Sequence, residues 1–297
     1  MHNFIILFDE KAGTSPLVRQ LDKFESISIL HQEDNAGFEP FDRHNCGRMS
    51  LHNLRKCFDI IYGQGPRNTE RLNRIYTKTA KRPLNMFDEK GVVGFKMRFT
   101  PPIRDPFPII ERFAANDRLT NLTQQCYKRY FKKTMFNLFK RREVVVLMAI
   151  RQDLLRLGLS IYHGDGTGKP GHIQFKMARG KFARDEIGKI DVDCERLEEI
   201  IAKLEDLHAE KRNLMEEFRQ AGIQSHPIFY EDFVADRCKY LEDLFKILEL
   251  NITRDEITHV LSQEEYLKKV HSDDISDFVD NHEEVMSRFA DRFVSWR

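Results

Sequence analysis

A short turn near the N-terminus carries the residues best suited to bind an anion. Residues 3–8, Asn-Phe-Ile-Ile-Leu-Phe, are apolar enough for a buried strand, and two acidic residues connect them to residues 11–15, Lys-Ala-Gly-Thr-Ser. Apolar side chains with helical spacing follow at Leu17, Leu21 and Phe24. In α/β proteins, the backbone N–H groups of such a turn and of the helix after it point at a phosphate. We therefore expect residues 11–15 to bind a phosphate-like group.

The side chains of the turn support the same expectation. Lys11 supplies a full positive charge, and Thr14 and Ser15 supply hydroxyl donors. Gly13 lets the backbone come close to a ligand, and Pro16 suits the first turn of a helix, where no N–H donor is needed. The turn is neither a Walker A loop nor a dinucleotide turn, because its lysine precedes the glycine and no GxGxxG sequence is present.

A second candidate anion site follows the most apolar segment of the chain. Residues 144–150, Val-Val-Val-Leu-Met-Ala-Ile, are typical of a central parallel strand covered on both faces. Arg151 comes next, and ligands of open α/β sheets bind beyond the carboxyl ends of the strands. Arg151 can hold a phosphate through two parallel hydrogen bonds, and Ser160 can add a hydroxyl if a helix forms between them. The alternatives are an Arg151 paired with a carboxylate and a Ser160 that only faces solvent.

Strands and helices are expected to alternate along the chain. Besides the two strands above, we expect strands at 26–30, 91–99 and 227–230, and helices at 51–62, 68–79, 106–116, 119–140, 151–160, 192–221 and 233–248. Such alternation predicts an α/β fold with a mostly parallel central sheet flanked by helices. We expect one domain over residues 1–297, with a loop insertion at 164–190 and a helical extension at 251–297.

Composition excludes several classes of protein. The 297 residues include 48 Lys and Arg against 47 Asp and Glu, so no net field favours nucleic acid or an anionic membrane. The start of the chain does not read as a signal peptide, and no apolar run approaches the ~20 residues of a membrane span. The five cysteines are far apart and form no CxxC pair, which favours reduced thiols in the cytoplasm over disulfides or a zinc site.

Taken in order, these motifs resemble those of sulfotransferases that use 3′-phosphoadenosine 5′-phosphosulfate. The phosphosulfate loop of that family typically reads Lys/Arg-x-Gly-Ser/Thr-Ser/Thr after the first strand, as residues 11–15 do. Arg151 with Ser160 is similar to the family's 3′-phosphate motif, and residues 230–236 are similar to its Tyr-Glu-Asp segment. Residues 39–41, Glu-Pro-Phe, resemble the Glu-Pro motif of carbohydrate sulfotransferases. The spacing is most similar to that of bacterial trehalose-type enzymes.

The resemblance implies a P-loop-like sulfotransferase fold, adenosine 3′,5′-bisphosphate as the product of the donor, and no metal. It implies that the donor is held by Lys11, Ala12, Gly13, Thr14, Ser15, Pro16, Arg151, Ser160 and Tyr230. Two departures stand out. The C-terminal Arg-Lys-Gly-x-x-Gly segment of cytosolic steroid and phenol sulfotransferases is missing, and trehalose-type enzymes usually carry Arg where this chain has Lys11.

Sulfuryl transfer needs charge stabilisation and a base. An acceptor oxygen attacks in line while negative charge builds on the leaving bridging oxygen, which Lys11 would stabilise. Glu39 is the first candidate base, because the Glu of the family's Glu-Pro motif faces the acceptor. His31, just beyond the second expected strand, is the second, because its pKa suits proton transfer near neutral pH. An ordinary structural role is the alternative for both residues.

Two further features point to substrate binding. Lys96 and Arg98 alternate with apolar residues, so one face of their strand is cationic and would bind an anionic substrate or simply face solvent. The glycine-rich residues 164–171, continuing to His172, would form a substrate lid or a surface insertion. Glu39, Lys96 and His172 are therefore the candidate substrate-binding residues.

The sequence thus predicts a cytoplasmic transferase that moves a sulfuryl group to a hydroxyl of a small-molecule or glycan acceptor, on a carbohydrate or glycolipid. A non-catalytic P-loop-like nucleotide-binding protein is the alternative, and a phosphotransferase is a third. A pure nucleoside triphosphate binder would need a metal-holding Asp after the apolar strand and a Walker lysine. Arg151 occupies the position of the metal-holding Asp, and Lys11 precedes the glycine of the turn, whereas a Walker lysine follows it.

Overall fold

The computed structural model describes ten stretches of the chain, which fall into two compact units. The described residues are 2–9, 11–31, 51–63, 68–80, 84, 91–98, 129–130, 132–166, 189–263 and 274–296. Unit 1 comprises Met1–Ile150 and Leu214–Ser262, and unit 2 comprises Arg151–Asn213 and Gln263–Arg297. Each unit has its own hydrophobic core. The sequence-based prediction of a single domain stays a prediction.

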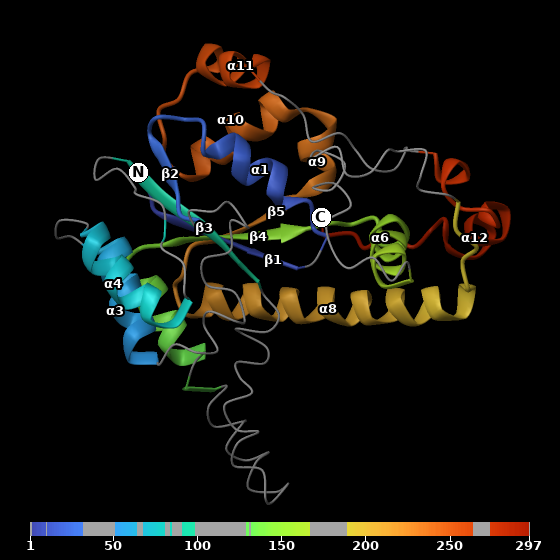
Figure 1. The fold of residues 1–297 in the computed structure, drawn as a ribbon, viewed down its shortest axis with the longest axis horizontal. Helices are drawn as coiled ribbons and strands as arrows, with labels where there is room; N and C mark the ends of the chain where they lie inside the picture. The colour runs from blue at the N-terminus through green and yellow to red at the C-terminus, as the bar shows by residue number, and fades with distance from the viewer. Residues whose placement is uncertain are drawn as a thin grey trace, which may run out of the picture. The chain divides into compact units, whose positions relative to one another are not determined.

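A five-stranded, all-parallel sheet lies at the centre of unit 1 (Figure 1), which confirms the predicted α/β class. Its strands are β1 (Phe4–Phe8), β2 (Ile27–Ile29), β3 (Val92–Arg98), β4 (Val145–Ile150) and β5 (Ser225–Phe229). Their order is β2-β3-β1-β4-β5. Because β2 and β3 lie on one side of β1 and β4 and β5 on the other, the chain changes direction across the sheet next to β1. In open α/β sheets, ligands bind beyond the carboxyl ends of the strands at such a point.

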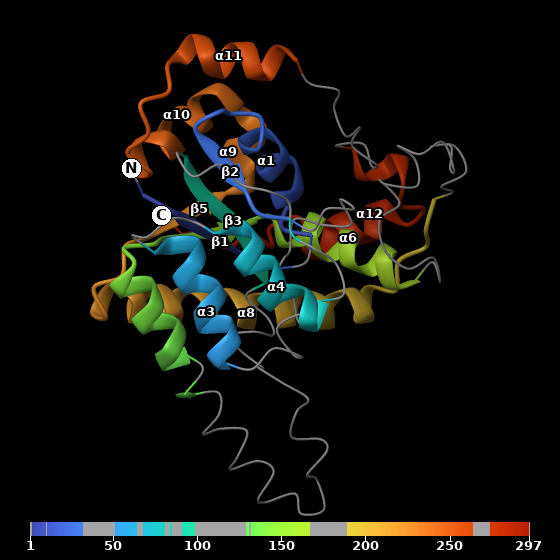
Figure 2. The same ribbon diagram turned by 60° about the vertical axis from the view of Figure 1, so that its left-hand side comes forward.

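Helices cover both faces of this sheet (Figures 1 and 2). They are α1 (Thr14–Leu21), α9 (Tyr230–Ala235), α10 (Arg237–Ile247) and α11 (Arg254–Ser262) on one face, and α3 (Leu51–Tyr62), α4 (Thr69–Ala80), a helical segment at 132–141 and the end of α8 on the other. On the first face, Leu17 and Leu21 of α1 pack with β1 and with Phe245 of α10. On the second, Phe58 of α3 lies edge-on to Phe95 of β3, with ring centroids 5.6 Å apart. The sheet is therefore buried on both faces, which explains its continuous apolar strands.

Several element boundaries differ from the sequence-based expectation, among them the strand expected at 227–230, which is observed at Ser225–Phe229. The single helix expected at 233–248 is two helices, because Asp236 is extended (φ −151°) and its side chain accepts a hydrogen bond from the N–H of Lys239 at the start of α10. The glycine-rich stretch expected as a loop from residue 164 begins as helix, since α6 (Leu154–Gly166) continues to Gly166.

Unit 2 is built from helices and the C-terminal residues. It contains α6, residues 194–213 of α8 (Cys194–Gln220), the 3-10 helix η3 (Ile275–Asp277) and α12 (His282–Phe289). Its core joins Leu157 of α6 with Leu197 and Ile201 of α8 and with Phe289 of α12. Among the described residues of both units, no helix combines the length and the apolar character needed to cross a membrane.

Several predictions concern residues outside the described stretches. They are the helix at 106–116, the first part of the helix at 119–140, Glu39 with its Pro-Phe neighbours, and His172 with most of the expected insertion at 164–190.

Candidate functional site

The turn after β1 is formed by left-handed backbone conformations. Lys11 has φ 60° and Gly13 has φ 73°, and the N–H of Ala12 donates to the carbonyl of Asp9 at 3.2 Å. Gly13 is the N-cap of α1, which begins at Thr14. Because glycine has no side chain to cap the helix, the N-cap leaves the first N–H groups of α1 for another acceptor. This is the local geometry from which a helix N-terminus binds an anion.

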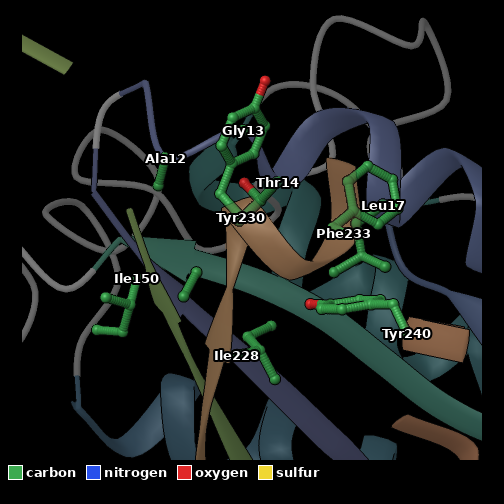
Figure 3. Close-up of a pocket in the computed structure, with 10 residues that line it drawn as sticks. Ala12, Gly13, Thr14, Leu17, Ile150, Ile228, Tyr230, Phe233 and Tyr240 are labelled. Carbon is green, nitrogen blue, oxygen red and sulfur yellow. The ribbon is translucent and has the colours of Figure 1, made fainter. Parts of the chain in front are cut away.

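Tyr230, the first residue of α9, packs directly on Gly13 (Figure 3). A Cβ added to Gly13 would lie 2.3 Å from Cδ2 of the Tyr230 ring, far inside van der Waals contact. Glycine is therefore required here twice, for its positive φ and for the space that the ring occupies. The contact brings Tyr230, one of the residues that the resemblance implies hold the donor, to the turn.

Lys96 of β3 also reaches the turn. Its Nζ donates a hydrogen bond to Oγ of Ser15 at 3.1 Å and lies 4.6 Å from the centroid of the Phe8 ring. The side chain is only 4 % exposed, so the reading of Lys96 as part of a solvated strand face is wrong. The reason is that β3 lies between β2 and β1 and is covered on both faces. A buried ammonium group next to helix N–H groups raises the positive potential at the turn.

The two lysines of the turn differ in exposure. Lys11 is exposed, whereas Lys96 is buried against Phe8 and held by Ser15. The buried charge is held beside the turn by its bond to Ser15, and the exposed one lies at the surface of the turn. Together they would place two cations next to an anion bound at the turn.

An apolar pocket lies against the same turn (Figure 3). It is lined by Ala12, Gly13, Thr14, Leu17, Ala149, Ile150, Ile228, Tyr230, Phe233 and Tyr240. Burial, reinforced by the nearby Asp232 carboxylate, raises the pKa of the Tyr240 phenol, so its hydroxyl stays protonated at neutral pH. Tyr240 meets Phe233 edge-on, with centroids 5.3 Å apart. The pocket thus places aromatic and aliphatic side chains next to the turn, around a hollow with room for little more than a water molecule.

Arg151 and Ser160 belong to unit 2. Arg151 follows β4 in the chain, and its backbone carbonyl accepts a hydrogen bond from His208. The helix on which the prediction for Ser160 depends is present: α6 begins at Leu154, and Asp153 accepts a hydrogen bond from the N–H of Arg156 at 2.8 Å, as a helix-capping residue does. Arg151 and Ser160 are both half-buried. Their role as phosphate ligands stays a prediction.

Of the two candidate bases, only His31 is described. It is half-buried after β2 and lies near the Asp22 carboxylate, which follows α1. Ile29 pairs with Gly94, which pairs with Phe4 at the start of β1, and His31 follows two residues after Ile29. The role of His31 as a base stays a prediction, and Glu39 and His172 lie outside the described residues.

Sequence reasoning missed three aromatic residues of this site: Phe8, Phe233 and Tyr240. Phe233 lies on α9 and Tyr240 on α10, so helical spacing across the break at Asp236 could not have revealed that their rings meet. Phe8 looked like any other apolar residue of β1. Its contact with Lys96 depends on the pairing of β1 with β3, in which Phe8 is opposite Arg98.

The fold and the site define an α/β protein with a parallel sheet and a glycine-containing, cationic turn where the chain changes direction across the sheet. Neither a protein-family model nor a curated protein sequence matches the chain. Among solved structures, it is similar to a sulfotransferase from Alicyclobacillus acidocaldarius, with 12% identity and a TM-score of 0.40 over 98% of this chain and 92% of that one. It is also similar to a sulfotransferase from Mycobacterium avium, with 11% identity and a TM-score of 0.39 over 97% and 75%. These values are too low to assign a family or a reaction.

Proposed function

We propose that this protein is a sulfotransferase that moves the sulfuryl group of 3′-phosphoadenosine 5′-phosphosulfate to a hydroxyl of a carbohydrate or glycolipid. The observation that carries the proposal is the buried Lys96, which bonds to Ser15 in the turn between β1 and α1. Together with the exposed Lys11 and the N-terminus of α1, it supports binding of a compact group with several negative charges.

The chemistry assigns a role to each part of the turn. The acceptor oxygen forms a bond to sulfur while the bond from sulfur to the bridging oxygen of the phosphosulfate breaks. The leaving nucleotide takes the electron pair of that bond, and the acceptor's proton passes to a base, for which Glu39 remains the first candidate. Lys11 and Lys96 would stabilise the charge that grows on the bridging oxygen, and the N–H groups of α1 would hold the 5′-phosphate.

The remainder of the donor has candidate partners of its own. The adenine would stack on the exposed part of the Tyr230 ring, and base stacking on an aromatic side chain is typically worth about 1–3 kcal/mol. Arg151 and Ser160 would bind the 3′-phosphate, as the resemblance to the sulfotransferase motif implies. We further propose that the enzyme acts in the cytoplasm.

The competing reading is a nucleotide-binding protein without transferase activity. It predicts the best binding by a nucleoside triphosphate with magnesium, whereas the sulfotransferase reading predicts the best binding by adenosine 3′,5′-bisphosphate without a metal. A ligand that binds only the native state raises its apparent stability, so a thermal-shift comparison of the bisphosphate, Mg-ATP and Mg-GTP separates the two.

The decisive experiment follows that comparison with transfer of labelled sulfate from the donor to a panel of carbohydrates and glycolipids. We expect the bisphosphate to stabilise the protein most and at least one acceptor to be labelled. Equal or greater stabilisation by Mg-ATP would refute the sulfotransferase proposal.

A further inference from the structure

The backbone that follows β4 is held by the last residues of the chain. The N–H of Val294 donates to the carbonyl of Gln152 at 3.0 Å, and the side-chain amide of Gln152 returns a bond to the carbonyl of Val294 at 3.1 Å. The N–H of Leu154 donates to the carbonyl of Arg292 at 3.0 Å. Residues 292–296, which we call the C-terminal strap, thus form a short ladder with the residues directly after Arg151.

The strap also acts on Arg151 itself, through a buried histidine. Nε1 of Trp296 donates to Nδ1 of His208 at 2.8 Å, and the ring of His208 bonds to the backbone carbonyl of Arg151. Because Nδ1 accepts, the other ring nitrogen, Nε2, carries the proton that the carbonyl accepts. His208 is 1 % exposed. Trp296, His208 and Arg151 therefore form one continuous chain of hydrogen bonds.

Arg212 of α8 fixes the end of the strap. Its guanidinium donates to the carbonyl of Ser295 at 2.6 Å and lies 5.1 Å from the centroid of the Trp296 ring. The indole is thus held on its face by a cation and at its N–H by His208. The strap is anchored to α8 by Arg212 and His208 and to the segment after β4 by Gln152 and Leu154.

We infer that the C-terminal strap is a positioning device for Arg151, in which Trp296 and His208 hold the backbone of that arginine in place for a phosphate of the ligand. This inference rests on the proposed function, in which Arg151 binds the 3′-phosphate of the donor. Trp296 and His208 touch no ligand in this scheme; they act through Arg151. By linkage, a ligand that engages Arg151 stabilises the docked strap to the same extent that the docked strap improves binding.

The test compares two nucleotides that differ only in the 3′-phosphate, adenosine 3′,5′-bisphosphate and adenosine 5′-monophosphate, by titration calorimetry. We expect the parent protein to bind the bisphosphate more tightly. Trp296→Phe keeps an aromatic ring and removes only the N–H donor, so it should lower affinity for the bisphosphate roughly three- to tenfold, as expected for a lost hydrogen bond. Its affinity for the monophosphate should not change.

Tyr162→Phe is the matched control, since it removes one polar atom from another aromatic residue of unit 2, where the Tyr162 hydroxyl accepts from the N–H of Asp193 at 3.0 Å. It should leave both affinities unchanged. A second readout needs no variant: the bisphosphate, and not the monophosphate, should slow hydrogen exchange at the amides of Leu154 and Val294 in the parent protein.

The outcomes are distinct. Equal losses for both nucleotides in Trp296→Phe, or unchanged affinities without added protection of the strap, would overturn the positioning role alone. A parent protein that binds both nucleotides equally would overturn this inference and the 3′-phosphate role of Arg151 together. Binding of the 5′-phosphate at the turn is tested separately, by the affinity for the monophosphate.

Discussion

Two segments of this protein have the composition of phosphate-binding sites, and they are held in opposite ways. The turn at 11–15 owes its shape to its own backbone, with positive φ at Lys11 and Gly13 and a helix that starts at the next residue. The segment 151–154 owes its place to distant residues, because its backbone partners are His208, Arg292 and Val294.

This difference predicts which changes should disturb each segment. A turn that depends on glycine is sensitive to any Cβ added at that position. A segment held by a buried histidine and by the C-terminal strap is sensitive to pH and to changes at residues that are distant in the sequence. Each of the following predictions tests one side of this comparison.

The largest effect is expected from Gly13→Ala. An alanine would carry the strain of a left-handed backbone, about 1–2 kcal/mol, and would force the Tyr230 ring away from 2.3 Å, an overpacking typically worth about 1–3 kcal/mol. We expect urea denaturation to show a loss of about 2–5 kcal/mol in the free energy of unfolding.

Gly222→Ala separates these two causes. Gly222 has φ 69°, similar to Gly13, but the nearest atom to an added Cβ is Nζ of Lys140 at 3.7 Å. It should lose only the strain of about 1–2 kcal/mol. If both alanine variants lose the same stability, Tyr230 does not press on the turn as described.

The second prediction concerns His208 and pH. Burial, with help from the charges of Lys211 and Arg212, lowers the pKa of His208 from 6.5 to about 4. Between these values the unfolded chain binds more protons than the folded one, so stability rises with pH. The contribution is fully present above pH 6.5 and is lost as pH falls to about 4, by at most about 3 kcal/mol.

The measurement is the free energy of unfolding at pH 7 and pH 4.5 for the parent, His208→Gln and His259→Gln. Carboxylates also lose stability in acid, so only the difference between proteins is informative. We expect the acid loss to shrink in His208→Gln and to persist with His259→Gln, because His259 is exposed on α11. Equal acid losses in all three proteins would show that His208 is not held neutral.

The fold class could be predicted from the sequence because its strands are apolar runs bounded by polar residues. The expected strand at 144–150 is observed at Val145–Ile150, and the expected helix at 51–62 is observed with the same bounds. The division at Asp236 was missed because the apolar spacing continues from α9 into α10. Only the capping bond to Lys239 marks the break, and such a bond depends on a backbone conformation that periodicity does not report.

The third prediction is that Lys96→Met weakens anion binding more than it affects folding. Methionine preserves the long apolar stem of lysine, and with it the packing against Phe8, and removes the charge. A lost charged contact is typically worth about 1.5–3 kcal/mol, roughly ten- to a hundredfold in affinity. Titration calorimetry with adenosine 3′,5′-bisphosphate measures it, with Lys23→Met, a change at an exposed residue, as the control. Unchanged affinity would remove Lys96 from the site.

Only part of the candidate functional site could be predicted from the sequence. The turn could be predicted because its residues are consecutive, so their types and their order predict the local backbone geometry. The burial of Lys96 could not, because alternation along one strand does not reveal which strands flank it. The strap could not either, since Arg151 and Trp296 are brought together by tertiary packing alone, and local patterns carry no information at such separations.

The smallest effect is expected from Ser15→Ala. Ser15 accepts the hydrogen bond of Lys96 at 3.1 Å, so its loss leaves the lysine charged and buried but less well oriented. A hydrogen bond of this kind is typically worth about 1 kcal/mol, or roughly a fivefold loss of affinity for adenosine 3′,5′-bisphosphate. If the Ser15 hydroxyl bound the ligand on its own, it would contribute the same free energy of binding with or without the charge of Lys96. A hydroxyl that acts through Lys96 would contribute much less once the lysine is gone, so the losses in Ser15→Ala and Lys96→Met should not add in the double variant. Strict additivity in this cycle would assign Ser15 to direct ligand binding and would separate it from the buried cation of the turn.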